Sequence, residues 1–280
     1  MAFQSAIINV MTTAAQKAGR GLTRDFGEVE NLQVSRKGPA DFVSKADTKA
    51  ERIVVNELTR ARPGWGLLLE EGGEHKGEDT RRRWIVDPLD GTTNFLHGIP
   101  HFAISIGLEE DGEIVAGVIY QPLTDEMFWA EKGRGAFVNN HRLRVSGRRE
   151  LNQSVVATGI PFAGRGDAAD HDRFISEMAT IMPEVAGIRR FGAAALDLAY
   201  VAAGRYDAFW ESGLATWDIA AGILLVREAG GMVSEFDGRA RMMETGQILA
   251  TNNALHGPLS RLLRKARKRP VIVDRTVDES

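Results

Sequence analysis

Residues 84–95, WIVDPLDGTTNF, constrain the fold more than any other stretch of this chain. Three bulky apolar residues predict a buried strand, which then runs into Asp87 and Asp90 on either side of Pro88. Because Pro88 has no backbone N–H and Asp90-Gly91 favours a turn, the strand is expected to end here. The two carboxylates therefore lie together at a sheet end, where they repel each other unless a proton or a cation neutralises them.

The same turn continues into a short predicted helix that begins with small polar residues, Thr92, Thr93 and Asn94. The first N–H groups of a helix lack partners within it and the helix dipole is positive there, so such a start favours anions. Carboxylate and carbonyl oxygens suit a hard ion such as Mg²⁺, which often binds the phosphate of a substrate as well. The turn therefore predicts a metal and phosphate site. For an isolated motif, a solvated turn with locally capped aspartates is the commoner explanation.

Other acidic residues occur in similar settings, and they favour a metal and phosphate site over a simple solvated turn. Glu70 and Glu71 follow a predicted short strand at 67–69. Asp47 begins one predicted helix and Asp218 begins another, where the simpler role of each is that of an N-cap. Several acids at the ends of different elements favour one shared acidic site.

The order of the predicted elements indicates a layered α/β protein with mixed sheets. A helix capped by Ser5 leads, through an exposed loop or irregular hairpin at 26–45, to a helix from Asp47 to Pro63-Gly64. Strands around an Asp111-Gly112 turn begin an antiparallel meander. After it, strands alternate with helices; the strands are at 154–160, 187–190, 206–211, 232–236 and 248–252, and the helices at 168–182, 193–204, 216–231 and 254–267.

The domain organisation is expected to be two closely packed halves, because the sequence contains no internal repeat and no low-complexity linker. The first half, 1–148, is α+β and carries the aspartate turn. The second half, 149–268, is α/β and carries the Trp-Asp motif around Asp218. Residues 269–280 are expected to form a tail.

The composition excludes several kinds of site. The chain of 280 residues has no cysteine, so it has no disulfide, thiolate metal site or cysteine nucleophile, and a cytoplasmic location is expected. Its formal net charge of −3 gives no global attraction to nucleic acid. Neither a signal peptide nor an apolar run of about 18 residues is seen, so no membrane span is expected. The six histidines do not have a metal-ligand spacing.

Four motifs together resemble the inositol monophosphatase family of Mg²⁺-dependent, lithium-sensitive sugar phosphatases. In chain order they are DFVSKADTKAE (41–51), the Glu70-Glu71 pair, DPLDGTTNF (87–95) and WDIAAG (217–222). The resemblance extends from about residue 5 to about residue 265. It implies the layered α-β-α-β-α sandwich of the sugar phosphatases.

The resemblance also implies the residues that hold two to three Mg²⁺ ions. These are Glu70, Asp87 and the backbone carbonyl of Leu89 for the first ion, Asp87, Asp90 and Asp218 for the second, and Glu70 with Asp47 for a third, weaker ion. The implied catalytic residues are Thr92, which with Asp47 orients the attacking water, and Glu70. One ion lowers the pKa of water and another receives the leaving alkoxide, so that water attacks the phosphate directly and in line.

The implied substrate-binding residues divide into a phosphate side and a sugar side. They are Gly91, Thr92 and Thr93 as the phosphate cradle and Gly192, Ala193, Ala194 and Glu211 facing the sugar hydroxyls, and Asp90 and Asp218 are implied to contact the substrate as well. For Gly192, a tight strand-to-helix turn is an equally good structural explanation.

The function predicted from this resemblance is Mg²⁺-dependent hydrolysis of myo-inositol monophosphate, or a similar polyol phosphate, by a homodimeric enzyme. Histidinol phosphate, fructose 1,6-bisphosphate and 3′-phosphoadenosine nucleotides are alternative substrates within the same class. A hypothesis of another class is contact with RNA polymerase or RNA, because some bacterial relatives also act in ribosomal RNA synthesis. The basic runs 81–83 and 261–269 could provide that contact, although a solvated surface is the simpler explanation.

Overall fold

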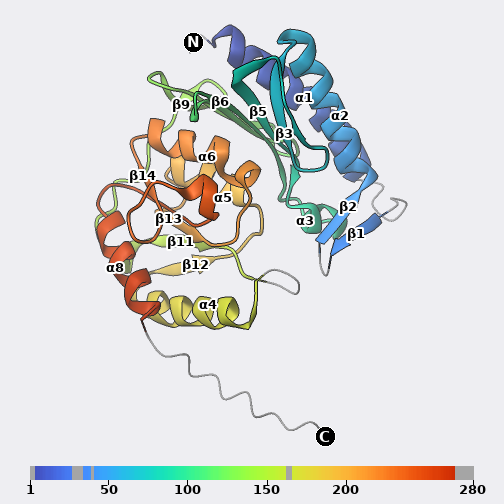
Figure 1. Ribbon diagram of the computed structural model, residues 1–280. Coiled ribbons are helices and arrows are strands. Elements are labelled where there is room, and N and C mark those ends of the chain that lie inside the picture. Colours follow the sequence, from blue (N-terminus) through green and yellow to red (C-terminus); the bar gives the residue numbers. More distant parts are fainter. Residues whose placement is uncertain (1–3, 27–33, 39–40, 162–165, 269–280) are drawn as a thin grey trace, which may run out of the picture.

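Five alternating layers of helix and sheet make up the protein in a computed structural model that describes residues 4–26, 34–38, 41–161 and 166–268 (Figure 1). From one side to the other, the layers are helices α1 (Ala6–Phe26) and α2 (Lys45–Ala61), an eight-stranded sheet, helices α5 (Ala194–Ala202) and α6 (Thr216–Glu228), a five-stranded sheet, and helices α4 (Ala168–Ile181) and α8 (His256–Ala266). The predicted five-layer sandwich is confirmed.

The eight-stranded sheet has the order β10-β9-β8-β7-β6-β5-β3-β4, in which only β3 and β5 run parallel. Its strands are β3 (Trp65–Leu69), β4 (Gly73–His75), β5 (Asp79–Asp90), β6 (Ala103–Glu110), β7 (Glu113–Gln121), β8 (Glu126–Glu131), β9 (Gly135–Val138) and β10 (His141–Arg142). The predicted meander corresponds to β6 through β10 and is confirmed.

The five-stranded sheet has the order β12-β11-β13-β15-β14. Strand β11 runs parallel to β12 and β13, whereas β15 runs antiparallel to β13 and β14. Its strands are β11 (Val155–Thr158), β12 (Gly187–Arg189), β13 (Ala208–Glu211), β14 (Met232–Ser234) and β15 (Ile248–Thr251). The short elements are the paired strands β1 (Val34–Gly38) and β2 (Asp41–Ser44), helices α3 (Thr92–Leu96) and α7 (Met242–Thr245), and 3₁₀ turns at Leu151–Gln153 and Met182–Glu184.

The predicted N-terminal cap is confirmed for the first helix and is wrong for the second. The Ser5 hydroxyl oxygen accepts a hydrogen bond from the Ile8 N–H (3.2 Å), which confirms Ser5 as a cap. Helix α2 begins at Lys45, so Asp47 lies inside its first turn and is not the N-cap. The earlier start turns the Asp47 side chain inward, where it is fully buried and available to the site described below. Of the two alternatives for residues 26–45, the irregular hairpin is present as the paired strands β1 and β2, while positions 27–33 and 39–40 of that segment lie outside the described residues.

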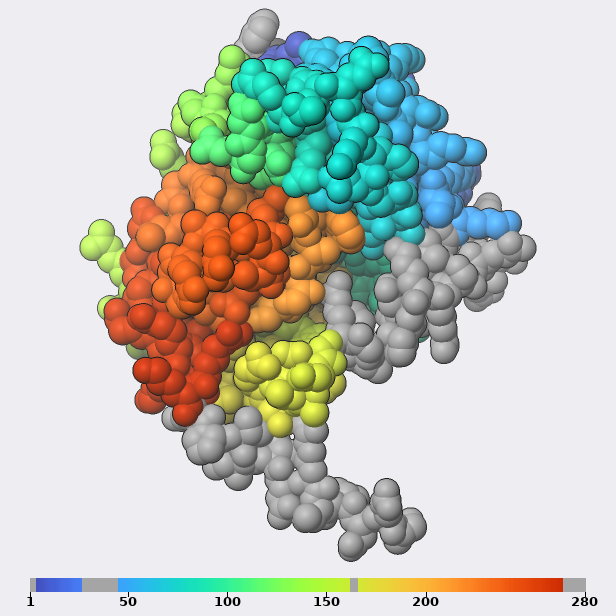
Figure 2. Space-filling view, in the orientation of Figure 1, coloured from blue at the N-terminus to red at the C-terminus, as the bar shows by residue number. Residues whose placement is uncertain are grey.

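Helix α6 lies very close to the eight-stranded sheet because two strand residues that face it are glycines. A Cβ atom at Gly107 would lie 3.1 Å from the Ala220 Cβ, and one at Gly117 would lie 2.9 Å from the Ala221 carbonyl oxygen. On their other side, α5 and α6 share one hydrophobic cluster with residues of the five-stranded sheet, such as Phe209. The middle helical layer therefore joins the two halves, which lie broadly against each other in Figure 2. The domain division near residue 148 stays a prediction.

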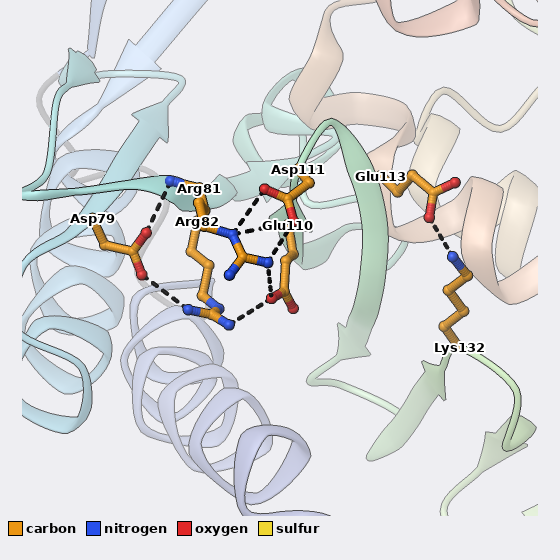
Figure 3. A network of polar contacts seen from close by, with 7 residues as sticks. All are labelled: Asp79, Arg81, Arg82, Glu110, Asp111, Glu113 and Lys132. Carbon is orange, nitrogen blue, oxygen red and sulfur yellow. Dashed lines mark hydrogen bonds and ion pairs between the residues drawn. The ribbon is translucent and has the colours of Figure 1, made fainter.

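The basic run 81–83 is neutralised by acidic residues at the start of β5, at the end of β6 and at the β6–β7 turn, and Figure 3 shows the contacts of Arg81 and Arg82. The Arg81 guanidinium donates to Asp111 (2.6 Å), and Arg82 bridges Asp79 (3.0 Å) and Glu110 (2.5 Å). Arg83 pairs with Glu109 at 3.0 Å in the same way. This run therefore presents paired charges. Separately, none of the described helices has both the length and the apolar character that crossing a bilayer requires.

Candidate active site

A pocket of about 120 Å³ collects nearly all the residues singled out in the sequence. It lies where the end of β5, the start of α3, and the N-terminal ends of α5 and α6 meet. Twelve of the thirteen predicted site residues line it: Glu70, Asp87, Leu89, Asp90, Gly91, Thr92, Thr93, Gly192, Ala193, Ala194, Glu211 and Asp218. The pocket is also lined by Asn94, which belongs to the predicted turn but was not assigned a role, and by four residues that the sequence did not indicate, Gly159, Ile160, Arg190 and Leu214.

A bulge in β5 sets the two carboxylates of the aspartate turn. Asp87 pairs with Ser105 on β6 and Asp90 pairs with Ala103, so β5 has one residue more than β6 between these pairs. The Asp87 Oδ1 atom accepts a hydrogen bond from the Leu89 N–H (2.9 Å) across the bulge. Both aspartates are buried. The strand that was expected to end at Pro88 therefore continues to Asp90, and the extra residue lets both carboxylates line the pocket.

The N-terminal ends of two helices supply the opposite wall. The Asp90 Oδ2 atom accepts from the Ala195 N–H in the first turn of α5 (2.8 Å). Asp218 is the third residue of α6, and its carboxylate accepts from the N–H of Ala215, the N-cap (2.8 Å), while the residue lines the pocket. The simpler role expected for Asp218, that of the N-cap itself, is therefore wrong.

The acidic residues of the pocket repel one another. Burial raises the pKa of Asp87 well above its ordinary value, and the nearby charges of Glu70, Asp90 and Asp218 raise it further. Burial and the charge of Asp218 likewise raise the pKa of Asp90, whereas the hydrogen bond from Ala195 opposes the rise. Four carboxyl groups close together, three of them on buried residues and that of Glu70 on a half-buried one, need protons or a positively charged partner.

This donor set fits a divalent cation of the Mg²⁺ type, which prefers carboxylate and carbonyl oxygens. In the described part of the chain, no three acidic or histidine side chains already stand in coordinating positions. One oxygen of Asp87, of Asp90 and of Asp218 instead accepts a backbone N–H, which fixes each carboxylate while the residue lines the pocket. A cation bound here would reverse the electrostatic cost of burying these groups.

Asp47 is the one predicted site residue that does not line the pocket, but it reaches the pocket through Thr92. The Thr92 hydroxyl lies 3.0 Å from the Asp47 Oδ1 atom and 3.0 Å from the Leu89 carbonyl oxygen. Asp47 is fully buried beneath it. The pairing of Thr92 with Asp47 that the resemblance implied is therefore present as a hydrogen bond.

The turn between β5 and α3 needs a glycine and is tied down by an asparagine. Gly91 has a φ of 92°, and a Cβ atom there would lie 3.0 Å from the His101 carbonyl oxygen. The Asn94 side-chain amide donates to the carbonyl oxygens of His101 and Phe191, both at 2.8 Å. Asn94 thus joins the aspartate turn to the segment before α5. Its place in the motif, directly after the two threonines, was the signal for this role.

The far side of the pocket depends on a second close approach. A Cβ atom at Gly159 would lie only 1.9 Å from the Glu211 Cδ atom, so the Glu211 carboxylate occupies the space that a side chain there would fill. Gly159 follows β11 and Glu211 ends β13, and these two strands pair in parallel. Gly192 has a φ of 80°, which favours glycine and explains the tight turn into α5.

Comparisons with known proteins agree with this arrangement. The model of the inositol monophosphatase family matches residues 4–268. An inositol-1-monophosphatase of Mesorhizobium japonicum is 59% identical over 268 residues, which cover 96% of this chain and 98% of that protein. The Nus factor SuhB of Pseudomonas aeruginosa is 46% identical over 249 residues, covering 88% and 91%. The crystal structure of the extragenic suppressor protein suhB from Bartonella henselae has a TM-score of 0.90 at 59% identity, covering 93% and 99%.

Proposed function

The chain belongs to the inositol monophosphatase family, and on that premise we propose that it hydrolyses inositol monophosphates to inositol and phosphate. It is a phosphoric monoester hydrolase. The observation that carries the proposal is the convergence of Glu70, Asp87, Asp90 and Asp218 on one pocket, next to the Gly91 turn. Asp87 and Asp90 belong to β5, Glu70 directly follows the neighbouring strand β3, and Asp218 belongs to α6. The fold thus brings together acidic residues from distant parts of the chain.

We propose that the same carboxylates bind two to three Mg²⁺ ions. Glu70, Asp87 and the Leu89 carbonyl would hold the first, and Asp87, Asp90 and Asp218 the second, with a weaker third near Glu70 and Asp47. When bound, such ions neutralise charge on the phosphoryl and departing oxygens and make a coordinated water more acidic. In support, burial and the neighbouring carboxylates, among them Glu70 and Asp218, raise the pKa of both Asp87 and Asp90.

The remaining steps belong to side chains and backbone groups of the protein. When the Thr92 hydroxyl donates its proton toward Asp47, its oxygen is left to accept a hydrogen bond from the attacking water. The water is thereby oriented toward phosphorus, and the Asp47 carboxylate stands ready to receive the displaced proton through Thr92. The backbone N–H groups of residues 91–93 hold the phosphoryl oxygens, because the start of α3 leaves them without helical partners.

On the sugar side, we propose that Glu211 and the backbone of residues 192–194 bind the inositol hydroxyls. A carboxylate accepts hydrogen bonds from hydroxyl groups, and the close turn at Gly192 lets the backbone approach the ring. Ala193 is almost fully buried, so the methyl groups beside this turn also exclude water from the ring.

We further propose that the enzyme is a lithium-sensitive cytoplasmic homodimer. The large apolar side chains of Ile99 and Phe191 are exposed at 46% and 44%, and the backbone of each is hydrogen-bonded to Asn94, through the Ile99 N–H (2.8 Å) and the Phe191 carbonyl oxygen (2.8 Å). Burial of such side chains against a second chain would remove apolar surface from water. The absence of cysteine is compatible with the reducing cytoplasm.

The test is a phosphate-release screen with the purified protein, with and without Mg²⁺. The substrates are myo-inositol 1-phosphate, histidinol phosphate, fructose 1,6-bisphosphate and 3′-phosphoadenosine 5′-phosphate. We expect Mg²⁺-dependent release from inositol phosphate, with the highest kcat/KM of the four. A preference for any of the other three would transfer the proposal to that substrate, and no release from any of them would remove the phosphatase function.

A second role is favoured by the exposed basic face of α8. Arg261, Arg264, Lys265 and Lys268 are exposed, and within the described residues they form no ion pair with a carboxylate. Position 269 of the predicted basic run lies outside the described residues. Because relatives are named Nus factors, we propose that this face contacts RNA polymerase or RNA.

Charge reversal on α8 tests this second role separately from catalysis. We expect that Arg261→Glu together with Lys265→Glu abolishes co-purification with RNA polymerase and binding of labelled RNA while phosphatase activity is kept. The matched control is Arg81→Glu together with Arg83→Glu, because these arginines are already paired with acids. If the wild type, the α8 double variant and the control double variant all bound RNA polymerase and RNA equally, the α8 face would be excluded as the contact surface.

A further inference from the structure

A second cavity, of about 300 Å³, adjoins the active-site pocket on the side of Glu211. The two cavities share Gly159, Ile160 and Glu211 as lining residues. The side pocket, as we name the second cavity, is further lined by residues that include Arg173, Phe174, Glu177, Ser212, Gln247 and Arg267. Its volume is at the lower end of the range typical of small-molecule sites, about 300–1,000 Å³.

The boundary between the two cavities is formed by Glu211, Gly159 and Ile160, of which Gly159 has no side chain. The Glu211 carboxylate lies over Gly159 in the place of a Cβ atom, and this pair faces both cavities. A substrate hydroxyl bound by Glu211 is therefore next to the side pocket. If the alcohol part of the substrate contains two rings, the second ring can extend past Glu211 while the first ring stays at residues 192–194.

The charges of the side pocket argue against a second phosphate. The Arg267 guanidinium donates to Glu177 (3.1 Å), which is 4% exposed, and Arg173 pairs with Asp170 (3.2 Å). Each arginine among the described lining residues is thus already neutralised, and Glu211 adds a further negative charge. A dianionic group would have to displace these carboxylates, at a cost in free energy.

The remaining wall groups suit a ring that is rich in hydroxyl groups. The Ser212 hydroxyl accepts from Arg267 (3.2 Å), so its own proton can be donated to a ligand. The Gln247 side-chain oxygen accepts from the Phe236 N–H (3.0 Å), which directs the amide NH₂ group to other partners. Phe174 adds an apolar ring to this wall, and a pocket that combines aromatic surface with a few polar groups can both bind and orient a ligand.

We propose that the side pocket binds the distal ring of phosphomonoesters whose alcohol consists of two linked sugar or polyol rings. The ring that carries the phosphate occupies the active-site pocket, and the second ring passes Glu211 and contacts Phe174, Ser212 and Gln247. The inference rests on the proposed phosphatase function, since it assigns the part of the substrate farthest from the phosphate.

The test compares trehalose 6-phosphate with glucose 6-phosphate, which have the same phosphate ester and differ by one ring. We expect the wild-type protein to give a kcat/KM about tenfold higher for trehalose 6-phosphate, equivalent to about 1.4 kcal/mol of added binding. In Phe174→Ala this advantage disappears, whereas glucose 6-phosphate and inositol 1-phosphate are hydrolysed as before. The control Ile175→Ala, on the same helix but 57% exposed and not lining the cavity, keeps the advantage.

The outcomes separate this inference from the proposed function. If Phe174→Ala is poorly folded, Ser212→Tyr fills the cavity from the opposite wall and has to produce the same selective loss. Equal kcat/KM for both sugar phosphates in the wild type, or a preference for fructose 1,6-bisphosphate or adenosine 2′-phosphate over trehalose 6-phosphate, overturns the inference while inositol phosphate is still hydrolysed. Failure to hydrolyse inositol phosphate and every other phosphate removes the proposed function itself.

Discussion

Replacing Asp90 with asparagine is expected to lower kcat/KM for inositol 1-phosphate at least about a thousandfold, a loss of about 4 kcal/mol in transition-state stabilisation. Asp90 faces Asp218 and Glu70 in the buried pocket, and it is one of three carboxylates assigned to the second cation. Asparagine keeps the size of the side chain and an oxygen that can accept the Ala195 N–H. The variant therefore removes a negative charge with little other change.

Thermal unfolding in the presence of a chelator distinguishes this loss from misfolding. Because Asp90 is repelled by neighbouring acids when no cation is present, the Tm of Asp90→Asn should equal or exceed that of the wild type. The matched control is Asp111→Asn, an exposed residue with a φ of 51° that asparagine tolerates well, and its activity should be unchanged. Retention of most Mg²⁺-dependent activity by Asp90→Asn would show that the assignment of Asp90 to the cation is wrong.

Replacing Thr92 with valine is expected to lower kcat about 10²-fold or more, the usual range for a lost proton-transfer contact, with little change in KM. Valine has nearly the shape of threonine and keeps the backbone N–H that we assign to the phosphate. It cannot donate to Asp47 or accept from water. The expected signature in steady-state kinetics is therefore a fall in kcat without loss of substrate binding.

A double-mutant cycle shows whether Thr92 and Asp47 act together. Asp47→Asn should also reduce kcat strongly, and the double variant should be scarcely worse than either single one, because both changes break the same water-orienting pair. Thr93→Val is the control, since the adjacent threonine lines the pocket but makes no described contact with Asp47. Additive losses from the two single changes would show that the residues act independently.

Much of the site could be predicted because its chemistry is concentrated in short local motifs. The strand, the two aspartates and the glycine turn of β5 are adjacent in sequence, so local rules were enough to bring Asp87, Asp90 and Gly91 together. The resemblance then added Asp218, which no local rule connects to β5. In the structure that connection depends on the glycines at 107 and 117, which let α6 lie close to the sheet.

The residues that were missed act through contacts distant in sequence. Gly159 matters only because β11 and β13 are neighbours, which places it against Glu211, and strand order cannot be derived from spacing alone. Arg190 reaches the pocket from the segment before α5. The start of α2 was misplaced by two residues because Asp47 is a good N-cap by residue type, whereas its buried bond with Thr92 is a tertiary contact.

Calorimetric titration of the metal-free protein with Mg²⁺ tests the central claim most directly. The claim is that carboxylates from β5, from the end of β3 and from α6 bind the same cations. The account predicts two or three binding events in the wild type. One of them should be lost in Asp90→Asn and in Asp218→Asn, whereas Asp111→Asn should bind as the wild type does. Unchanged number and affinity of Mg²⁺ sites in Asp90→Asn and Asp218→Asn would contradict it.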